Sequence, residues 1–76
     1  MNKSFNFQDV ILGKVRKEDI MVQIFLLSGF QIKGIVKGFD NYVIIVESEG
    51  KIQMIYKHAV STIIPLKPLE HLSLND

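Results

Sequence analysis

The chain has 76 residues, no cysteine and a formal net charge of +1 at pH 7. A domain this small buries only about 60% of the surface of its unfolded chain, so it commonly needs disulfides, a metal or oligomerisation. Disulfides are excluded because there is no cysteine, and two histidines without a thiol make a poor zinc site. The near-neutral charge does not by itself indicate a nucleic-acid partner.

The apolar content favours oligomerisation, and the absence of cysteine and of a signal peptide favours a cytoplasmic location. Hydrophobic residues make up 47% of the chain and the mean hydropathy is +0.22, so we expect another copy of the chain to cover part of the apolar surface. No apolar run approaches the ~20 residues that span a bilayer. Residues 1–4 lack the apolar core of a signal peptide, and the absence of cysteine agrees with a reducing compartment.

Residues 5–18 have the pattern of a short amphipathic helix. Asn6 followed by Asp9 resembles a capping box, and Asp9 also suits the positive end of the helix dipole. Apolar residues recur at three- and four-residue spacing, namely Phe7, Val10, Ile11 and Val15. We expect the helix to end near Glu18 and Asp19.

Two strands joined by a tight turn are predicted next. Residues 20–27 alternate as a strand does, and Ser28–Gly29 indicates a hairpin turn. The second strand, over residues 30–39, contains Gly34 and Gly38. Interior glycines permit a sharp bend or a close backbone approach, which closing a small barrel requires.

Three further strands complete the predicted sheet. Residues 42–46 form a continuous β-branched run, typical of a central strand covered on both faces. Strands at 52–56 and 60–64 follow, the last stopped by Pro65, and residues 67–76 form a short flexible tail. The sequence therefore predicts one domain over residues 1–66, a small β-barrel with an N-terminal helix and five bent antiparallel strands. The last two strands are short, apolar edges that invite pairing with the next copy, and head-to-tail pairing can close a ring.

Several segments in this order resemble the Hfq family of bacterial Sm-like RNA chaperones. The resemblance covers roughly residues 7–66, and its most specific block is residues 56–65. The matching segments are Gln8–Asp9, Arg16–Lys17–Glu18, Ile24–Phe25–Leu26, Ser28–Gly29, Gly34, Phe39–Asp40 and Tyr56–Lys57–His58–Ala59–Val60–Ser61–Thr62–Ile63–Ile64–Pro65. It implies a homohexameric Sm-like ring that binds small regulatory RNAs and messenger RNAs and promotes their base pairing, with no cofactor.

The resemblance implies a uridine-rich RNA site on the helix side of the ring. Its residues are Gln8, Asn41, Tyr42, Lys57 and His58. An aromatic ring can stack a base while cationic and amide groups meet phosphates and base edges. Read singly, Tyr42 is more often a half-buried strand aromatic, His58 a turn or core histidine and Lys57 an ordinary solvated lysine. In a ring these groups repeat around one pore, so the positive potential there is stronger than the net charge of +1 per chain suggests.

The opposite face is expected to bind purine-rich RNA. The implied residues are Phe25, Gly29, Phe30, Gln31, Ile32, Gln53 and Thr62. Phe25 is out of phase with Ile24 and Leu26, so it faces either the core or a base. Better-known members differ at Ser28, Gln31 and Lys33, so a purine preference is expected rather than a strict adenine repeat.

The outer rim is expected to use Arg16 and Lys17, near Lys14 at the helix end. A solvated helix face, with Glu18 and Asp19 as partners, explains the same pattern. Strongly annealing members carry an arginine where this chain has Asp19, which predicts weaker annealing.

Two other classes of function remain to be compared with RNA binding. An enzyme is not expected, because no nucleophile elbow, phosphate loop or metal-ligand spacing is present. The alternative is a structural or protein-binding small β-barrel oligomer without RNA annealing activity. A salt titration distinguishes them, since phosphate contacts weaken steeply as salt rises.

Overall fold

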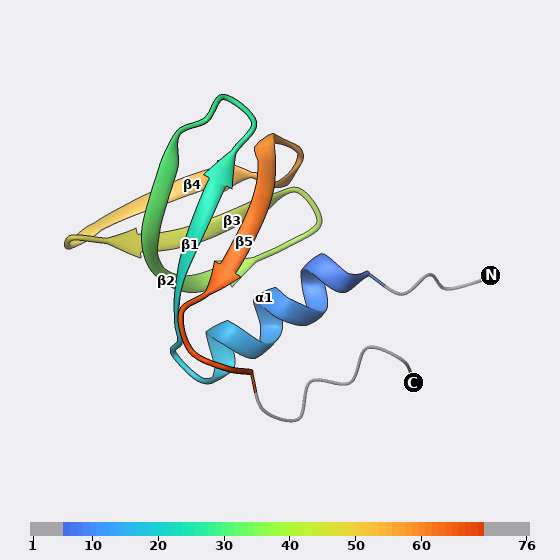
Figure 1. Cartoon of the computed structure of the whole chain (residues 1–76), viewed down its shortest axis with the longest axis vertical. Coiled ribbons are helices and arrows are strands. Elements are labelled where there is room, and N and C mark those ends of the chain that lie inside the picture. The colour runs from blue at the N-terminus through green and yellow to red at the C-terminus, as the bar shows by residue number, and fades with distance from the viewer. Residues whose placement is uncertain (1–5, 70–76) are drawn as a thin grey trace.

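The computed structural model describes residues 6–69, and Figure 1 shows one helix followed by a strongly bent antiparallel sheet. The elements are α1 (Phe7–Lys17), β1 (Met21–Leu26), β2 (Gln31–Phe39), β3 (Val43–Ser48), β4 (Lys51–Tyr56), the 3-10 turn η1 (Lys57–Ala59) and β5 (Val60–Pro65). The predicted fold of an N-terminal helix and five antiparallel strands is confirmed.

Helix α1 begins at a side-chain cap. The Oδ1 atom of Asn6 accepts a hydrogen bond of 3.2 Å from the backbone N–H of Asp9, as the sequence predicted. The carboxylate of Asp9 is used elsewhere, because it contacts the ammonium group of Lys57. At the other end the chain leaves the helix through Asp19, whose φ of 53° is left-handed.

The sheet has the strand order β4-β3-β2-β1-β5, so β4 and β5 form its two edges. Every neighbouring pair in this order is antiparallel. Figure 1 shows that the sheet curls around and that α1 lies across one end of it. The edge positions expected for the last two strands are therefore confirmed.

The bend is built into β2, the longest strand, by two local features. A Cβ atom at Gly34 would lie 2.3 Å from the backbone oxygen of Glu47, so only glycine allows β2 and β3 to approach this closely. Further along, the register with β3 shifts between Val36 and Gly38, which makes Lys37 a bulge residue. A bulge bends a strand and increases its twist.

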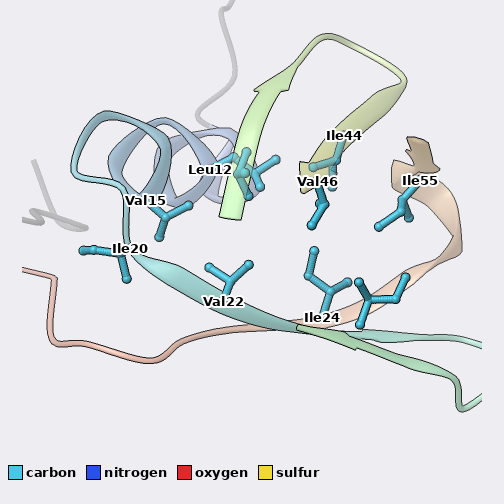
Figure 2. Packing of buried hydrophobic residues seen from close by; sticks show 10 residues of the cluster. Leu12, Val15, Ile20, Val22, Ile24, Ile44, Val46 and Ile55 are labelled. Atoms are coloured by element: carbon cyan, nitrogen blue, oxygen red, sulfur yellow. The ribbon is translucent and has the colours of Figure 1, made fainter. Parts of the chain in front are cut away.

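The core lies between α1 and one face of the curled sheet. Figure 2 shows Leu12 and Val15 of the helix pointing toward side chains of β1 and β3. The buried cluster comprises Leu12, Val15, Ile20, Val22, Ile24, Ile32, Val36, Ile44, Val46 and Ile55. Phe25 is not part of this cluster, because its neighbours Val22 and Ile24 occupy the inward positions of β1.

Strand β3 differs from its prediction. Ile44 and Val46 are fully buried, but Val43 and Ile45 are only half-buried. The expectation of a strand covered on both faces was wrong, because the core covers one face of the sheet only. A continuous apolar run does not distinguish these two situations.

Two parts of the predictions lie at the ends of the chain. Leu69, in the predicted tail, packs against the core cluster. Phe5 of the predicted helix, together with residues 70–76 of the tail, lies outside the described residues. No helix in the described part of the chain is long and apolar enough to cross a membrane.

Candidate nucleic-acid interface

Three segments that are far apart in the sequence meet beside the first turn of α1. We call these residues the helix-side cluster: Gln8, Asp9, Asn41, Tyr42, Lys57 and His58. The backbone N–H of Lys57 donates to the backbone oxygen of Tyr42 at 2.8 Å, which joins η1 to the turn before β3. The ammonium group of Lys57 donates to Oδ1 of Asp9 at 2.5 Å, which joins η1 to the helix.

Lys57 is the buried centre of this cluster. Its side chain is only 9% exposed, while that of Asp9 is 34% exposed. Its Nζ atom also lies 5.3 Å from the ring centroid of Phe39, a cation–π distance. The sequence suggested a solvated charge that meets phosphate, whereas the structure shows an ammonium group whose charge is offset by Asp9. It lies inward because the η1 turn directs it toward the helix.

A second carboxylate shapes the turn that carries Tyr42. Oδ1 of Asp40 accepts hydrogen bonds from the backbone N–H groups of Tyr42 at 2.7 Å and Val43 at 2.9 Å. These bonds, and to a lesser extent the charge of Lys57, hold the pKa of Asp40 below its usual value because they favour the ionised form. The turn presents Tyr42 with 73% of its surface exposed. Reading Tyr42 as a half-buried strand aromatic is therefore wrong.

The remaining polar groups of the cluster face outward to different degrees. His58 is exposed, and its ring stacks on that of Tyr56 with centroids 5.8 Å apart and planes at 28°. Asn41 is exposed beside Tyr42, and Gln8 is half-buried in the first turn of α1. The structure thus presents an exposed aromatic ring, an exposed imidazole and an exposed amide on the two segments that Lys57 joins, while Lys57 itself is buried and paired with Asp9.

A separate groove of about 390 Å³ lies on the outward face of the sheet, between the β1–β2 and β3–β4 hairpins. Its lining residues are Gln23, Phe30, Gln31, Ile32, Lys33, Ser48, Glu49 and Gln53. Figure 1 shows both hairpin ends projecting away from α1. The groove and the helix-side cluster therefore belong to different regions of the molecule.

The comparisons with known proteins agree on one family. The sequence matches the Hfq protein family over residues 7–70. The RNA-binding protein Hfq of Alkaliphilus metalliredigens is 56% identical over 72 residues, which is 95% of this chain and 90% of that protein. The RNA-binding protein Hfq of Alkaliphilus oremlandii is 61% identical over 69 residues, or 91% of this chain and 86% of that protein.

A solved structure supports the same family through its fold. A 1.55 Å crystal structure of Hfq, described there as a pleiotropic translational regulator, superposes with a TM-score of 0.74. Its sequence is 42% identical, and the match covers 78% of this chain and 98% of that one. The chain belongs to the Hfq family. Its fold is the Sm-like fold, and the relatives compared above are named RNA-binding proteins.

All but one of the residues that the Hfq resemblance assigns to the opposite face fall into two groups in one chain. Phe30, Gln31, Ile32 and Gln53 line the groove, although the side chain of Ile32 is 7% exposed and belongs to the core. The other group lies along the β1–β5 pairing. Here Phe25, half-buried on the outward face, is the register partner of Thr62.

Gly29 stands apart from both groups because it has a conformational role. Its φ of 95° is left-handed, and its N–H donates to the backbone oxygen of Leu26 at 2.9 Å. The residue allows the β1–β2 turn and holds Phe30 at the mouth of the groove, where that ring is 65% exposed.

The resemblance did not single out four of the residues that line the groove. These are Gln23, Lys33, Ser48 and Glu49. Gln23 and Lys33 are register partners on β1 and β2. Their outward position follows from the alternation that buries Val22 and Ile24, so strand periodicity could have found them. Asp9 was noted only as a helix-capping residue, because the sequence does not show what its carboxylate faces.

The rim residues Arg16 and Lys17 are exposed in the last turn of α1. Neither forms an ion pair with another residue in the range 6–69. Lys14 pairs with Glu18 at 3.4 Å, so it contributes less free charge to the rim than its neighbours.

Proposed function

We propose that this chain is a subunit of a homohexameric ring that binds small regulatory RNAs and messenger RNAs and promotes their base pairing. The observation that carries the proposal is the helix-side cluster, where hydrogen bonds join three distant segments and leave Tyr42 and His58 exposed together. An exposed ring beside an imidazole and amide groups suits unstacked RNA bases. The activity consists of binding and annealing, with no chemical step.

The helix-side cluster is proposed to bind uridine-rich RNA. Tyr42 supplies the stacking surface, His58 donates to a base oxygen or phosphate, and Gln8 and Asn41 read base edges. Lys57 donates hydrogen bonds from the base of the site. Because Asp9 offsets its charge, Lys57 contributes less to long-range phosphate attraction than an exposed lysine.

The groove side is proposed to bind purine-rich RNA. Phe25 and Phe30 offer rings, while Gln31, Gln53 and Thr62 offer polar groups for base edges. In the proposed ring, β4 of one subunit pairs with β5 of the next. That pairing would bring Thr62, on β5, to the strand that carries Gln53 of the neighbouring subunit, and so join the two groups that one chain keeps apart.

The edge strand β4 supports the ring. Its outward residues Ile52, Met54 and Tyr56 are 63%, 58% and 52% exposed. A row of exposed apolar side chains on an unpaired edge favours strand addition by another copy. The rim of Arg16 and Lys17 would then repeat around the ring, with Asp19 weakening its field at each subunit.

The test combines the mass of the assembly with RNA affinity as a function of salt. Native mass spectrometry is expected to give six copies, and both oligouridylate and oligoadenylate are expected to bind at low salt and weaken steeply as salt rises. A monomer would contradict the ring. A ring that binds neither RNA at low salt would instead support the protein-binding alternative.

A further inference from the structure

Two glutamines on neighbouring strands of the groove are hydrogen-bonded to each other. Nε2 of Gln23 on β1 donates to Oε1 of Gln31 on β2 at 2.8 Å. Gln23 lies opposite Lys33 and Gln31 lies opposite Phe25 in the strand register, so the bond runs diagonally across the pair of strands. Diagonal neighbours are within reach of long side chains.

This bond determines which atom Gln31 presents to the groove. A carboxamide has one oxygen that accepts and one NH₂ group that donates. Because the oxygen of Gln31 accepts from Gln23, the bond orients the carboxamide with its oxygen toward Gln23, and the NH₂ group is left to donate to a ligand. Gln23 is half-buried whereas Gln31 is exposed, so the more buried side chain orients the more exposed one.

The outward NH₂ group of Gln31 can donate to one atom that all purines share. On their major-groove edge, adenine and guanine both carry the acceptor N7, while the adjacent group is a donor in adenine and an acceptor in guanine. Pyrimidines have no ring nitrogen acceptor on that edge. A donor aimed at N7 therefore selects purines without distinguishing adenine from guanine, and Phe30 at the same groove offers a stacking surface.

We propose that Gln23 is a positioning residue that makes the groove purine-selective, by holding the NH₂ group of Gln31 toward N7 of the bound base. The inference rests on the proposed RNA-binding function and adds a residue and an atom to it. It involves hydrogen bonding only.

The experiment compares a short oligoadenylate with the same RNA made from 7-deazaadenine, which lacks the N7 acceptor. Fluorescence anisotropy with the full chain is expected to show weaker binding of the deaza RNA, by about 2- to 10-fold per contacted base for one hydrogen bond. In Gln23→Leu and in Gln31→Ala that difference is expected to vanish. An RNA of alternating adenine and guanine, with both bases in deaza form, is expected to behave in the same way.

A variant that replaces the donor by an acceptor gives a sharper form of the test. Gln23→Glu places an acceptor where the donor was, so Gln31 turns its NH₂ group toward residue 23 and its oxygen toward the groove. The difference in affinity between natural and 7-deaza RNA is then expected to disappear, while a hydrogen bond between residues 23 and 31 persists. Lys33→Gln, a groove residue outside the amide pair, is the matched control and should weaken both RNAs by the same factor.

The outcomes separate this inference from the proposed function. Unchanged affinity for oligouridylate and an intact ring in Gln23→Leu show that only the groove has changed. If natural and deaza RNAs bind the unmutated protein equally, or if the difference survives in Gln23→Leu and Gln23→Glu, the inference is overturned while RNA binding stands. Failure of every RNA to bind at low salt would overturn both.

Discussion

The helix-side cluster and the groove present the groups proposed to bind RNA in opposite ways. In the cluster, the exposed Tyr42 and His58 are supported by backbone hydrogen bonds and by the part-buried Asp9–Lys57 pair. In the groove, the polar side chains lie on the outward positions of strands, and the bond between Gln23 and Gln31 joins the side chains themselves. The helix-side cluster is therefore held by contacts that also stabilise the fold, whereas the groove consists of side chains on the outer surface of the sheet.

This difference has a consequence for how each site tolerates change. Substitutions beneath the helix-side cluster should affect stability and RNA binding together, because Lys57 joins the helix to η1 and packs over Phe39. Substitutions in the groove should affect binding alone. Base preference on the groove side can therefore vary at little cost in stability.

The largest expected effect comes from removing the partner of the buried lysine. Asp9→Ala leaves the ammonium group of Lys57 buried and unpaired, so the free energy of unfolding should fall by about 2–3 kcal/mol. Affinity for oligouridylate should fall as well. Urea unfolding and anisotropy measure the two effects. The matched control is Glu18→Ala, which breaks the more exposed pair with Lys14 and should change stability by less than about 0.5 kcal/mol.

Equal stabilities of Asp9→Ala and Glu18→Ala would show that the helix-side cluster does not stabilise the fold. The proposed difference between the helix-side cluster and the groove would then be contradicted.

The next effect separates the exposed part of the cluster from its support. Tyr42→Ala removes a ring that is 73% exposed, so stability should hardly change. Loss of base stacking should weaken oligouridylate binding by about 1–3 kcal/mol per stacked base, with oligoadenylate affinity unchanged. Anisotropy with both RNAs measures this. An equal loss for both RNAs would argue against two separate sites.

A smaller effect is expected for the corresponding aromatic of the groove. Phe30→Ala should weaken oligoadenylate binding by about 1 kcal/mol and leave oligouridylate binding and the urea midpoint unchanged, since the ring is 65% exposed. Leu27→Ala is the matched control, because that side chain is 71% exposed near the same turn but does not line the groove. A similar loss in both variants would mean that the turn, rather than the ring, matters.

The smallest effect concerns the pH dependence of the turn that presents Tyr42. The pKa of Asp40 is lower in the folded chain than its model-peptide value of 3.8, because backbone N–H groups bond to its ionised form. Its contribution to stability is therefore complete above that value and is lost as pH falls through the folded pKa. Asp40→Asn should flatten the acid limb of the stability curve below about pH 4. Acid titration followed by circular dichroism tests this, and an unchanged limb would contradict it.

Local patterns in the sequence were sufficient to predict most of the fold. The Asn6 cap, the alternation along β1 and the glycine-rich β2 each have a local physical cause, and the structure contains all three. The prediction that residues 42–46 are covered on both faces was wrong, because the sequence pattern does not show whether a second layer packs on the outer face of the sheet. Phe25 could not be placed by periodicity alone, because alternation gives two faces without saying which one is inside.

The candidate sites were less predictable for a related reason. Tyr42 and His58 follow from their turn positions and the family resemblance, but the pairing of Lys57 with Asp9 joins residues 48 positions apart. The bond between Gln23 and Gln31 requires the register of β1 on β2, which the sequence gives only to within a residue or two. Long-range pairing is the information that a one-dimensional pattern lacks.

The central claim is that one chain carries two RNA sites that act separately. The most direct test titrates the assembled ring with labelled oligouridylate in the presence of saturating unlabelled oligoadenylate. Because the helix-side cluster and the groove are in different regions, the affinity for oligouridylate should be unchanged and both RNAs should be bound together. Displacement of oligouridylate by oligoadenylate at equal salt would contradict the account.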